Sequence, residues 1–193
     1  MKKAIFMLIC IAASLTSCNV TRKLPLQVYD CKLSLSDTQQ NKIEPMSYED
    51  SMIVISFAAS RNSINFGLKN KLSTPIVIDW DGCSFVQNGK NLRVMHNGIN
   101  FVHRNEPMAK TSVAPGTVIN DFIAPTDNVY YYTGFITGFY NVMPGWFFND
   151  LFKVSEKEAL TPEMAYAQKG QQISVMLSLE IDGKKQPRIF NFI

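Results

Sequence analysis

Two carboxylates, Asp79 and Asp81, flank Trp80 in the stretch DWDG. In an extended strand both carboxylates would share one face of the sheet, and Trp80 would take the other face. Such a pair can bind calcium or cleave a glycosidic bond, for which the carboxyl groups stand about 5–9.5 Å apart. The same letters also favour a turn, because Asp accepts hydrogen bonds from nearby amides and glycine opens a turn. We favour a turn with Trp80 in the core, and we expect no catalytic residue here.

The two histidines of the chain, His96 and His103, are the other residues that could support catalysis. A catalytic zinc site takes three protein ligands around an open position, so Asp79 or Asp81 would have to join both histidines. The histidines stand seven positions apart across Gly98, which is not a usual ligand spacing. The chain also has no HExxH, CxxC, GxSxG or glycine-rich phosphate motif. We therefore expect no metal, no cofactor and no enzymatic activity, and both histidines facing solvent.

The most unusual stretch for binding is NVYYYTGFITGFYNVMPGWFFN, residues 128–149, which has no charged residue and holds nine of the 22 aromatic residues. Three interpretations remain open. The stretch could span a membrane, although several glycines and Pro144 interrupt it. It could be core that packs under a helix, or part of it could be an exposed aromatic loop. An exposed loop would contact a partner or stack on a glycan, and its candidate contact residues are Trp146, Tyr131, Phe135 and Tyr140.

Two cysteines, Cys31 and Cys83, offer a different chemistry. In an oxidising compartment they could form a disulfide. The bond requires Cα atoms within about 7 Å of each other, which spacing along the chain does not reveal. The alternative is two buried free thiols, so we keep Cys31 and Cys83 as a possible disulfide.

A third cysteine, Cys18, ends the stretch LTSC, which follows Lys2, Lys3 and ten apolar residues at 4–13. A membrane-spanning helix needs about 20 apolar residues, so this run indicates a secretory signal. LTSC resembles the lipobox of bacterial lipoproteins, in which the thiol accepts a diacylglycerol as a thioether. The resemblance implies that residues 1–17 are a lipoprotein signal peptide and that Cys18 carries a stable lipid anchor. The alternative is an ordinary signal peptide that contains a cysteine.

The lipoprotein resemblance also implies a location. Asn19 stands where Asp would favour retention at the inner membrane, so we expect the outer membrane, with the protein facing the periplasm. Residues 18–26 have the composition of a lipidated tether. Two of the 19 basic residues lie in the signal, which leaves 17 basic against 16 acidic residues. A nucleic-acid surface needs a clustered basic face, so we expect no nucleic-acid partner. The membrane contact that we expect is the one implied by the lipid anchor at Cys18.

The remaining residues, 27–193, suit one β-sandwich domain, because short strand patterns alternate with turns. For example, Ile64, Phe66 and Leu68 alternate with polar residues, as in a half-buried strand. We predict strands at 26–35, 52–59, 63–70, 75–80 and 114–125, hairpins around Asn88-Gly89 and Asp182-Gly183, a loop at 34–51, and one helix at 161–170 before the last hairpin.

The stretches INFGLKNKLSTPIVIDWDGCSFVQNGKNLRVMHNG, APGTVINDFIAP and GQQISVMLSLEIDGKK resemble those of a set of uncharacterised bacterial envelope lipoproteins of the Bacteroides type. The resemblance covers about residues 60–193 with gaps and leaves 133–149 unmatched. It implies an immunoglobulin-like β-sandwich and an envelope location, but no reaction. We therefore expect a lipid-anchored envelope protein that serves as a non-catalytic interaction or assembly module. The alternative is a glycan-binding lipoprotein that uses the aromatic loop at 128–149.

Overall fold

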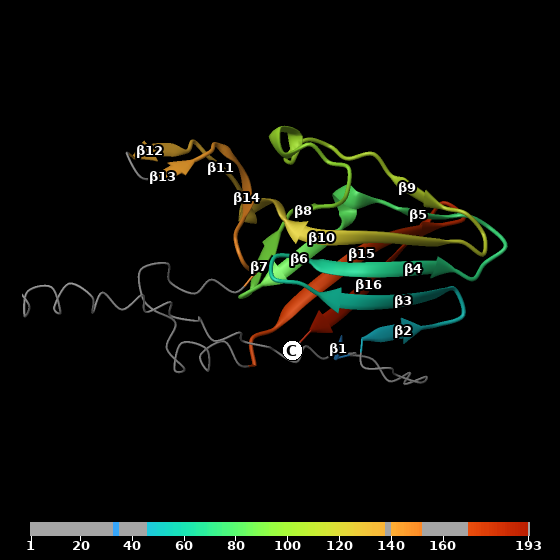
Figure 1. The fold of residues 1–193 in the computed structure, drawn as a ribbon. Coiled ribbons are helices and arrows are strands. Elements are labelled where there is room, and N and C mark those ends of the chain that lie inside the picture. The colour runs from blue at the N-terminus through green and yellow to red at the C-terminus, as the bar shows by residue number, and fades with distance from the viewer. Residues whose placement is uncertain (1–32, 35–45, 138–139, 152–169, 193) are drawn as a thin grey trace, which may run out of the picture.

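The computed structural model describes residues 33–34, 46–137, 140–151 and 170–192. In these ranges the chain forms an all-β sandwich of two antiparallel sheets, from which a β-ribbon extends (Figure 1). No helix in the described ranges is long and apolar enough to cross a membrane. The sandwich confirms the predicted all-β class, whereas its immunoglobulin-like arrangement stays a prediction.

The larger sheet is built around β15 (Ile173–Ile181), which pairs with β16 (Lys184–Phe192) along its whole length. The other edge of β15 pairs with β6 (Ser84–Gln87) near its start and with β5 (Ile76–Ile78) near its end. One long strand therefore joins two short ones into a single sheet. The outer strands of this sheet are β1 (Leu33–Ser34) on β16, β7 (Lys90–Leu92) on β6 and β9 (Thr111–Val113) on β5.

The smaller sheet has five strands in the order β2-β3-β4-β10-β8. Its central strand, β4, pairs residue by residue with both neighbours, with no bulge in either register. This regular pairing fixes which side chains share each face of the sheet. The strands of this sheet are β2 (Ser47–Glu49), β3 (Ile53–Ala59), β4 (Ile64–Asn70), β8 (Val94–Met95) and β10 (Val118–Pro125).

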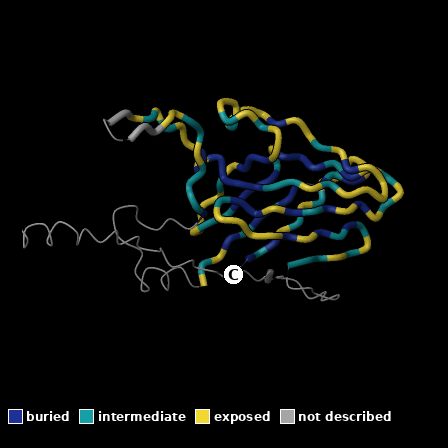
Figure 2. Tube along the Cα trace, viewed as in Figure 1, coloured by how far each residue is buried: buried dark blue, intermediate teal, exposed yellow. Residues whose placement is uncertain are grey.

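Alternate residues of the two sheets are buried and pack in the core, and Figure 2 colours the buried parts of the trace dark blue. On β4 the buried positions are Ile64, Phe66 and Leu68, as the sequence pattern predicts, and also Asn70 at the end of the strand. Phe57 of β3 contacts Phe190 of β16 across the sandwich, with their ring centroids 4.8 Å apart. Full burial of one such side chain contributes about 1.5–3 kcal/mol to the free energy of unfolding.

Both predicted hairpins are confirmed. Asn88 and Gly89 have φ angles of 52° and 71°, and Asp182 and Gly183 have φ angles of 50° and 73°. Two successive positive φ values give a turn whose twist matches that of the flanking strands, and Asn-Gly and Asp-Gly tolerate this conformation best. The turn between β15 and β16 therefore sets the register of the longest strand pair.

Two other segments differ from the predictions. The predicted loop at 34–51 contains β2, because the ring of Tyr48 lies 5.6 Å from Phe190 and gives this polar segment one apolar contact with the core. The predicted strand at 75–80 ends at Ile78, and Trp80–Gly82 form the 3₁₀ turn η1 instead.

One strand was missed by the sequence predictions, and two predicted elements lie partly or mostly outside the described residues. β9 (Thr111–Val113) was not predicted, because its three residues carry little pattern of their own. Of the predicted strand at 26–35, only β1 is described. The predicted helix at 161–170 lies outside the described residues, apart from Gly170.

The ribbon outside the sandwich is formed by residues 129–148, which we call the aromatic arm. Near the sandwich, β11 (Val129–Tyr132) pairs with β14 (Gly145–Phe148), and further out β12 (Phe135–Thr137) pairs with β13 (Tyr140–Val142). In Figure 1 the arm, in orange, points away from both sheets. The stretch that sequence patterns could not assign is therefore a β-hairpin that lies mostly outside the core.

Candidate functional site

The register of the aromatic arm divides its side chains between two faces. Tyr131 lies opposite Trp146 in the antiparallel pair, and Tyr130 lies opposite Phe147. Directly opposed residues share a face, and neighbours along a strand take opposite faces. Tyr131 and Trp146 therefore belong to one face, which we call the inner face, and Tyr130 and Phe147 belong to the outer face.

The inner face connects the arm to the sandwich through the 3₁₀ turn η2 (Phe101–His103). The ring of Phe101 lies 5.9 Å from that of Trp146 and 5.4 Å from that of Phe148. The guanidinium of Arg104 lies 5.2 Å from the centre of the Trp146 ring, a cation–π arrangement. Trp146 is half-buried as a result, so the base of the arm has a small core of its own.

The outer face of the arm is open. Tyr130 and Phe147 are 39% and 43% exposed, and their ring centroids lie 6.0 Å apart. Of the eight large apolar side chains that are exposed in the described ranges, five belong to the arm. Figure 2 shows the arm mostly in the colours of exposed and intermediate residues. The five are Tyr130, Tyr131, Phe135, Met143 and Phe147, whereas Val102, Val118 and Ile189 are scattered elsewhere.

The structure places the four candidate contact residues on the arm but in different surroundings. Tyr131 is 51% exposed and Phe135 is 47% exposed, so both are accessible. Trp146 lies between Phe101 and the edge-on ring of Tyr131. Tyr140 begins β13, but its side chain lies outside the described part of the chain. The sequence did not single out Tyr130 and Phe147, because only the strand register shows that they share the open face.

The stretch DWDG has the structure of a turn with a buried tryptophan. Trp80 is fully buried, and its Nε1 donates a hydrogen bond to Thr111 Oγ1 at 2.8 Å. Asp79 contacts Lys185 Nζ at 2.9 Å, and this hydrogen bond lowers the pKa of the Asp79 carboxyl. Asp81 contacts Arg93 at 2.6 Å. Each carboxylate therefore has its own cation, which supports the turn interpretation.

The same turn satisfies the backbone of β15 between its two short partners. Asp79 N–H donates to the carbonyl oxygen of Ser178, and Ser178 N–H donates to Cys83 Sγ at 3.3 Å. A buried backbone group without a partner is costly, so these contacts stabilise β15 where neither β5 nor β6 reaches it. A Cβ atom on Gly82 would lie 2.7 Å from Ser178 Oγ, which explains why glycine stands at this position.

Cys83 is buried and has no disulfide partner among the described residues. Its Sγ donates to the carbonyl oxygen of Asp79 at 3.3 Å, and burial raises the pKa of the thiol to about 11. Such a thiol is protonated and unreactive at neutral pH. Cys31 lies outside the described residues, so the pairing of Cys31 with Cys83 stays a prediction.

The two histidines lie in separate environments. His96 is buried, which corrects the expectation that it faces solvent, and its ring stacks on Trp80 with centroids 3.9 Å apart. Its Nδ1 lies 3.2 Å from Asp121 Oδ2. His103 is exposed and contacts Glu106 at 2.8 Å. Among the described residues, no group of three or more His, Cys, Asp or Glu side chains could hold a metal ion.

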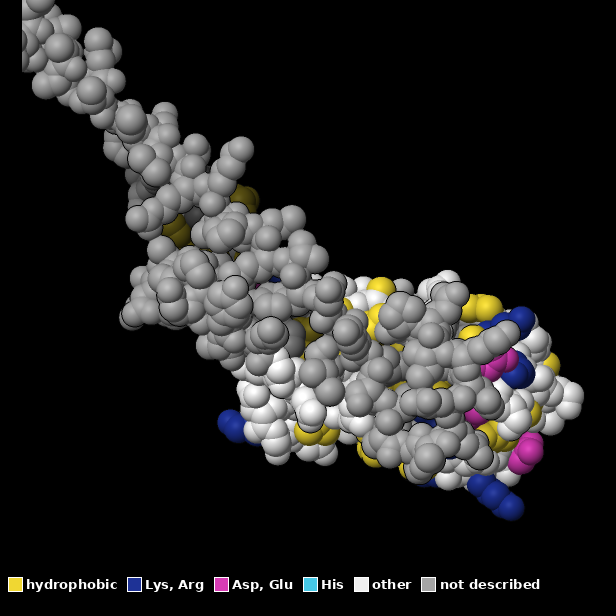
Figure 3. All heavy atoms as spheres, turned by 90° about the horizontal axis from the view of Figure 1, so that it is seen from below, with side chains coloured by type: hydrophobic (Ala, Val, Ile, Leu, Met, Phe, Trp, Pro, Cys, Tyr) yellow, Lys and Arg dark blue, Asp and Glu magenta, His cyan; other side chains and the backbone are white. Residues whose placement is uncertain are grey.

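The surface charges are mixed in sign. In the space-filling view of Figure 3, basic and acidic side chains on the described part of this face lie near one another and do not gather into a patch of one sign. This distribution agrees with the nearly balanced numbers of basic and acidic residues in the sequence. The uncharged arm therefore differs from the rest of the surface in composition as well as in shape.

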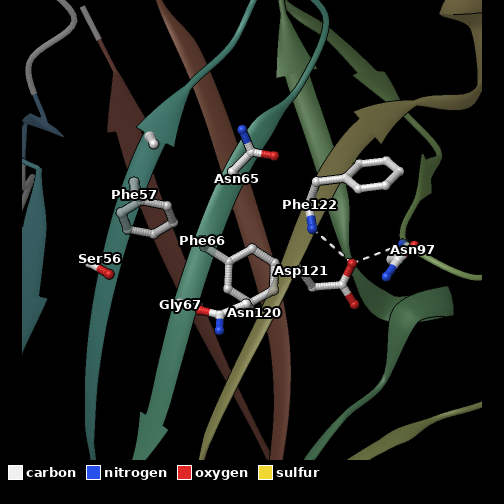
Figure 4. Close-up of a pocket in the computed structure, with 10 residues that line it drawn as sticks. Ser56, Phe57, Asn65, Phe66, Gly67, Asn97, Asn120, Asp121 and Phe122 are labelled. Atoms are coloured by element: carbon white, nitrogen blue, oxygen red, sulfur yellow. Dashed lines mark hydrogen bonds between the residues drawn. The ribbon is translucent and has the colours of Figure 1, made fainter.

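A second candidate site, which sequence patterns did not indicate, lies on the outer face of the smaller sheet. It is an open groove of about 410 Å³ over β3, β4 and β10 (Figure 4). Its residues are far apart in the sequence, and the only local signal was Gly67 inside an otherwise regular strand pattern.

Comparison of the chain with models of known protein families, with curated proteins and with solved structures gave no match.

Proposed function

We propose that this protein is a lipid-anchored envelope protein, attached to the outer membrane through Cys18 and facing the periplasm. In this proposal it is a non-catalytic interaction module that binds a partner protein through the outer face of its aromatic arm. The observation that carries the proposal is the concentration of exposed large apolar side chains on an uncharged ribbon outside the sandwich. Exposed large apolar side chains gathered on one segment are typical of interaction sites.

The composition of the arm supports a protein partner. The cores of protein interfaces are enriched in Tyr, Trp, Phe and Met and depleted of charged residues. The arm has this composition, and residues 128–149 contain no charge. Tyr130 and Phe147 supply two adjacent exposed rings on the outer face, and Met143, between β13 and β14, is 69% exposed.

The geometry of the arm gives a second argument. In the described ranges, neither β11 nor β14 pairs with a strand of the sandwich, so the outer edges of this ribbon are open. An isolated two-stranded ribbon is only marginally stable in water. Phe101 and Arg104 stabilise the inner face, whereas no described residue outside the arm forms such a layer on the outer face. A partner protein that binds the outer face would supply this second layer.

The glycan-binding alternative depends on the same arm. Stacking of a sugar requires an accessible ring face, and Trp146 has Phe101, Tyr131 and the Arg104 guanidinium around its ring. The contacts of Trp146 therefore favour a partner protein over stacking of a glycan on this residue.

The proposal is tested by photo-crosslinking in the native bacterium. A benzoylphenylalanine replaces Phe147 on the outer face of the arm, and in a control protein it replaces Ile189, which is 55% exposed on β16. We expect a discrete crosslinked protein of constant mass from position 147 and none from position 189. Crosslinks of equal yield from both positions, or none from position 147, would contradict the proposal.

A further inference from the structure

The groove on the outer face of the smaller sheet is formed by two rows of side chains. In one row, Ser56 of β3 and Asn120 of β10 lie opposite Gly67 of β4. In the next row, Asn65 of β4 lies opposite Phe122 of β10. Since opposed residues share a face, these side chains from three adjacent strands surround one hollow of about 410 Å³ (Figure 4). This volume lies within the range of small-ligand sites, about 300–1,000 Å³.

Gly67 is the floor of this groove, and the backbone does not require glycine there. The residue lies in the central strand, it is not among the residues with positive φ, and the register around it has no bulge. Glycine inside a regular strand is unfavourable and often marks the close approach of a ligand or of another backbone. A Cβ atom here would lie 2.9 Å from Asn120 Oδ1 and 3.3 Å from Ser56 Oγ. Because Gly67 has no side chain, Asn120 Oδ1 and Ser56 Oγ can lie close to the backbone of β4.

The polar groups of the groove are free to bind a ligand. Ser56, Asn65 and Asn120 are exposed, and their side chains make no hydrogen bond with another described residue. Each carboxamide presents two N–H donors and one carbonyl acceptor, and a hydroxyl can both donate and accept. The groove thus offers donors and acceptors side by side over a small area.

The groove offers no free charge. Among the described residues that line it, Asp121 is the one ionisable residue, and both of its carboxylate oxygens are engaged. Oδ1 accepts hydrogen bonds from the backbone N–H groups of Asn97 at 2.8 Å and Phe122 at 2.7 Å. Oδ2 lies 3.2 Å from Nδ1 of His96. This carboxylate positions the loop at Asn97 against β10, and it leaves amides and a hydroxyl to meet a ligand.

We propose that this groove binds an uncharged sugar ring of a glycan. Adjacent hydroxyls of a pyranose each donate and accept, which matches the paired donors and acceptors of Asn65 and Asn120. Phe122 lines the groove and also packs on the small core at the base of the arm, so only its exposed part can meet the C–H face of the sugar ring. The polar residues of this site belong to β3, β4 and β10, so the site adjoins the arm only through Phe122 and does not depend on the proposed partner protein.

The test is nuclear magnetic resonance titration of the full chain, in detergent micelles, with nitrogen-labelled asparagine and tryptophan. The probes are neutral oligosaccharides of glucose, mannose, galactose and xylose, with oligogalacturonate as the anionic comparison. We expect at least one neutral probe to shift the side-chain amide signals of Asn65 and Asn120 in a saturable manner. Asn120→Ala should weaken binding roughly fivefold to tenfold, because one or two hydrogen bonds are lost.

The matched control is Asn91→Ala, the same change at an exposed position of β7 on the other sheet. It should leave the affinity unchanged, and Asn65→Ala should weaken binding as Asn120→Ala does. The proposal is overturned if no neutral probe shifts these signals or if only oligogalacturonate binds. It is also overturned if Asn65→Ala and Asn120→Ala both bind as well as the control, or if shifts are confined to the indole of Trp146. The last result would place glycan binding on the arm.

Discussion

Aromatic side chains have different surroundings in the sandwich and in the aromatic arm. Phe57 and Phe190 meet between two sheets, and both are buried. Tyr130 and Phe147 meet within a single ribbon and remain 39% and 43% exposed. The same class of residue thus stabilises the fold where a second layer covers it, and forms an accessible surface where none does. The role of an aromatic side chain here therefore depends on whether it lies between two sheets or on a single ribbon, and not on its residue type.

The largest expected effect comes from Phe190→Ala. This ring is 1% exposed, so its loss leaves a cavity between the sheets, and we expect the free energy of unfolding to fall by about 3–5 kcal/mol. Phe147→Ala, on the outer face of the arm, should change it by less than about 1 kcal/mol. Urea denaturation of both variants measures the difference. Equal losses would show that the arm belongs to the cooperative core, and the comparison would fail.

Substitution of Gly82 and Gly67 compares a tightly packed position of the sandwich with an open one. Gly82→Ala places a Cβ atom 2.7 Å from Ser178 Oγ of β15, and we expect the free energy of unfolding to fall by about 1–3 kcal/mol. Gly67→Ala meets only the ends of two side chains at the open groove, and alanine is the better strand residue, so stability should rise by about 0.5–1 kcal/mol. Urea denaturation tests both signs. A loss at Gly67 equal to that at Gly82 would mean that the groove is packed as tightly as the core.

Arg104→Ala tests how the arm is connected to the sandwich. Loss of the cation–π contact with Trp146 should weaken that connection by about 0.5–1 kcal/mol. Amide hydrogen exchange in β11 and β14 should then become roughly twofold to fivefold faster, while exchange in β15 stays unchanged. Arg93→Ala, which removes a surface ion pair with Asp81, is the control and should leave both regions unchanged. Faster exchange in β15 would mean that the arm and the sandwich open together.

The smallest effect is a dependence on pH within the sandwich. Lys185 lowers the pKa of Asp79 in the folded protein, so the ion pair stabilises the fold above the ordinary pKa of a carboxyl group. This contribution is lost as the pH falls from that ordinary value through the lowered one. Lys185→Met should lower the free energy of unfolding at neutral pH by less than about 1 kcal/mol. It should also make the fall of this free energy from neutral to acidic pH shallower, and urea denaturation at neutral and at acidic pH measures both effects. An unchanged acid profile would contradict this role of Lys185.

Local patterns predicted much of the sandwich. The alternation of Ile64, Phe66 and Leu68 gave the buried face of β4, and the pairs Asn88-Gly89 and Asp182-Gly183 gave both hairpins, because these features depend only on neighbouring residues. The turn interpretation of DWDG was likewise possible because Asp and Gly have strong turn preferences.

Features that depend on distant contacts were not predictable in this way. His96 is buried because it stacks on Trp80, and nothing near His96 in the sequence shows that ring. The groove needs Ser56, Gly67 and Asn120 side by side, which only the register of three strands establishes. An exposed arm was one of several interpretations of residues 128–149, because an aromatic sequence does not show whether another layer of the fold covers it.

The central position of β15 has a consequence for the order of folding. Its partners β5 and β6 precede it by roughly a hundred residues, and β1 is paired with β16 from near the other end of the chain. The larger sheet therefore cannot close until residues 173–192 are present, whereas β3, β4 and β10 can pair earlier. Contacts between such distant segments slow folding. A chain shortened before residue 173 would leave the apolar faces of β5 and β6 without the strand that unites them, and we expect it to aggregate or be degraded.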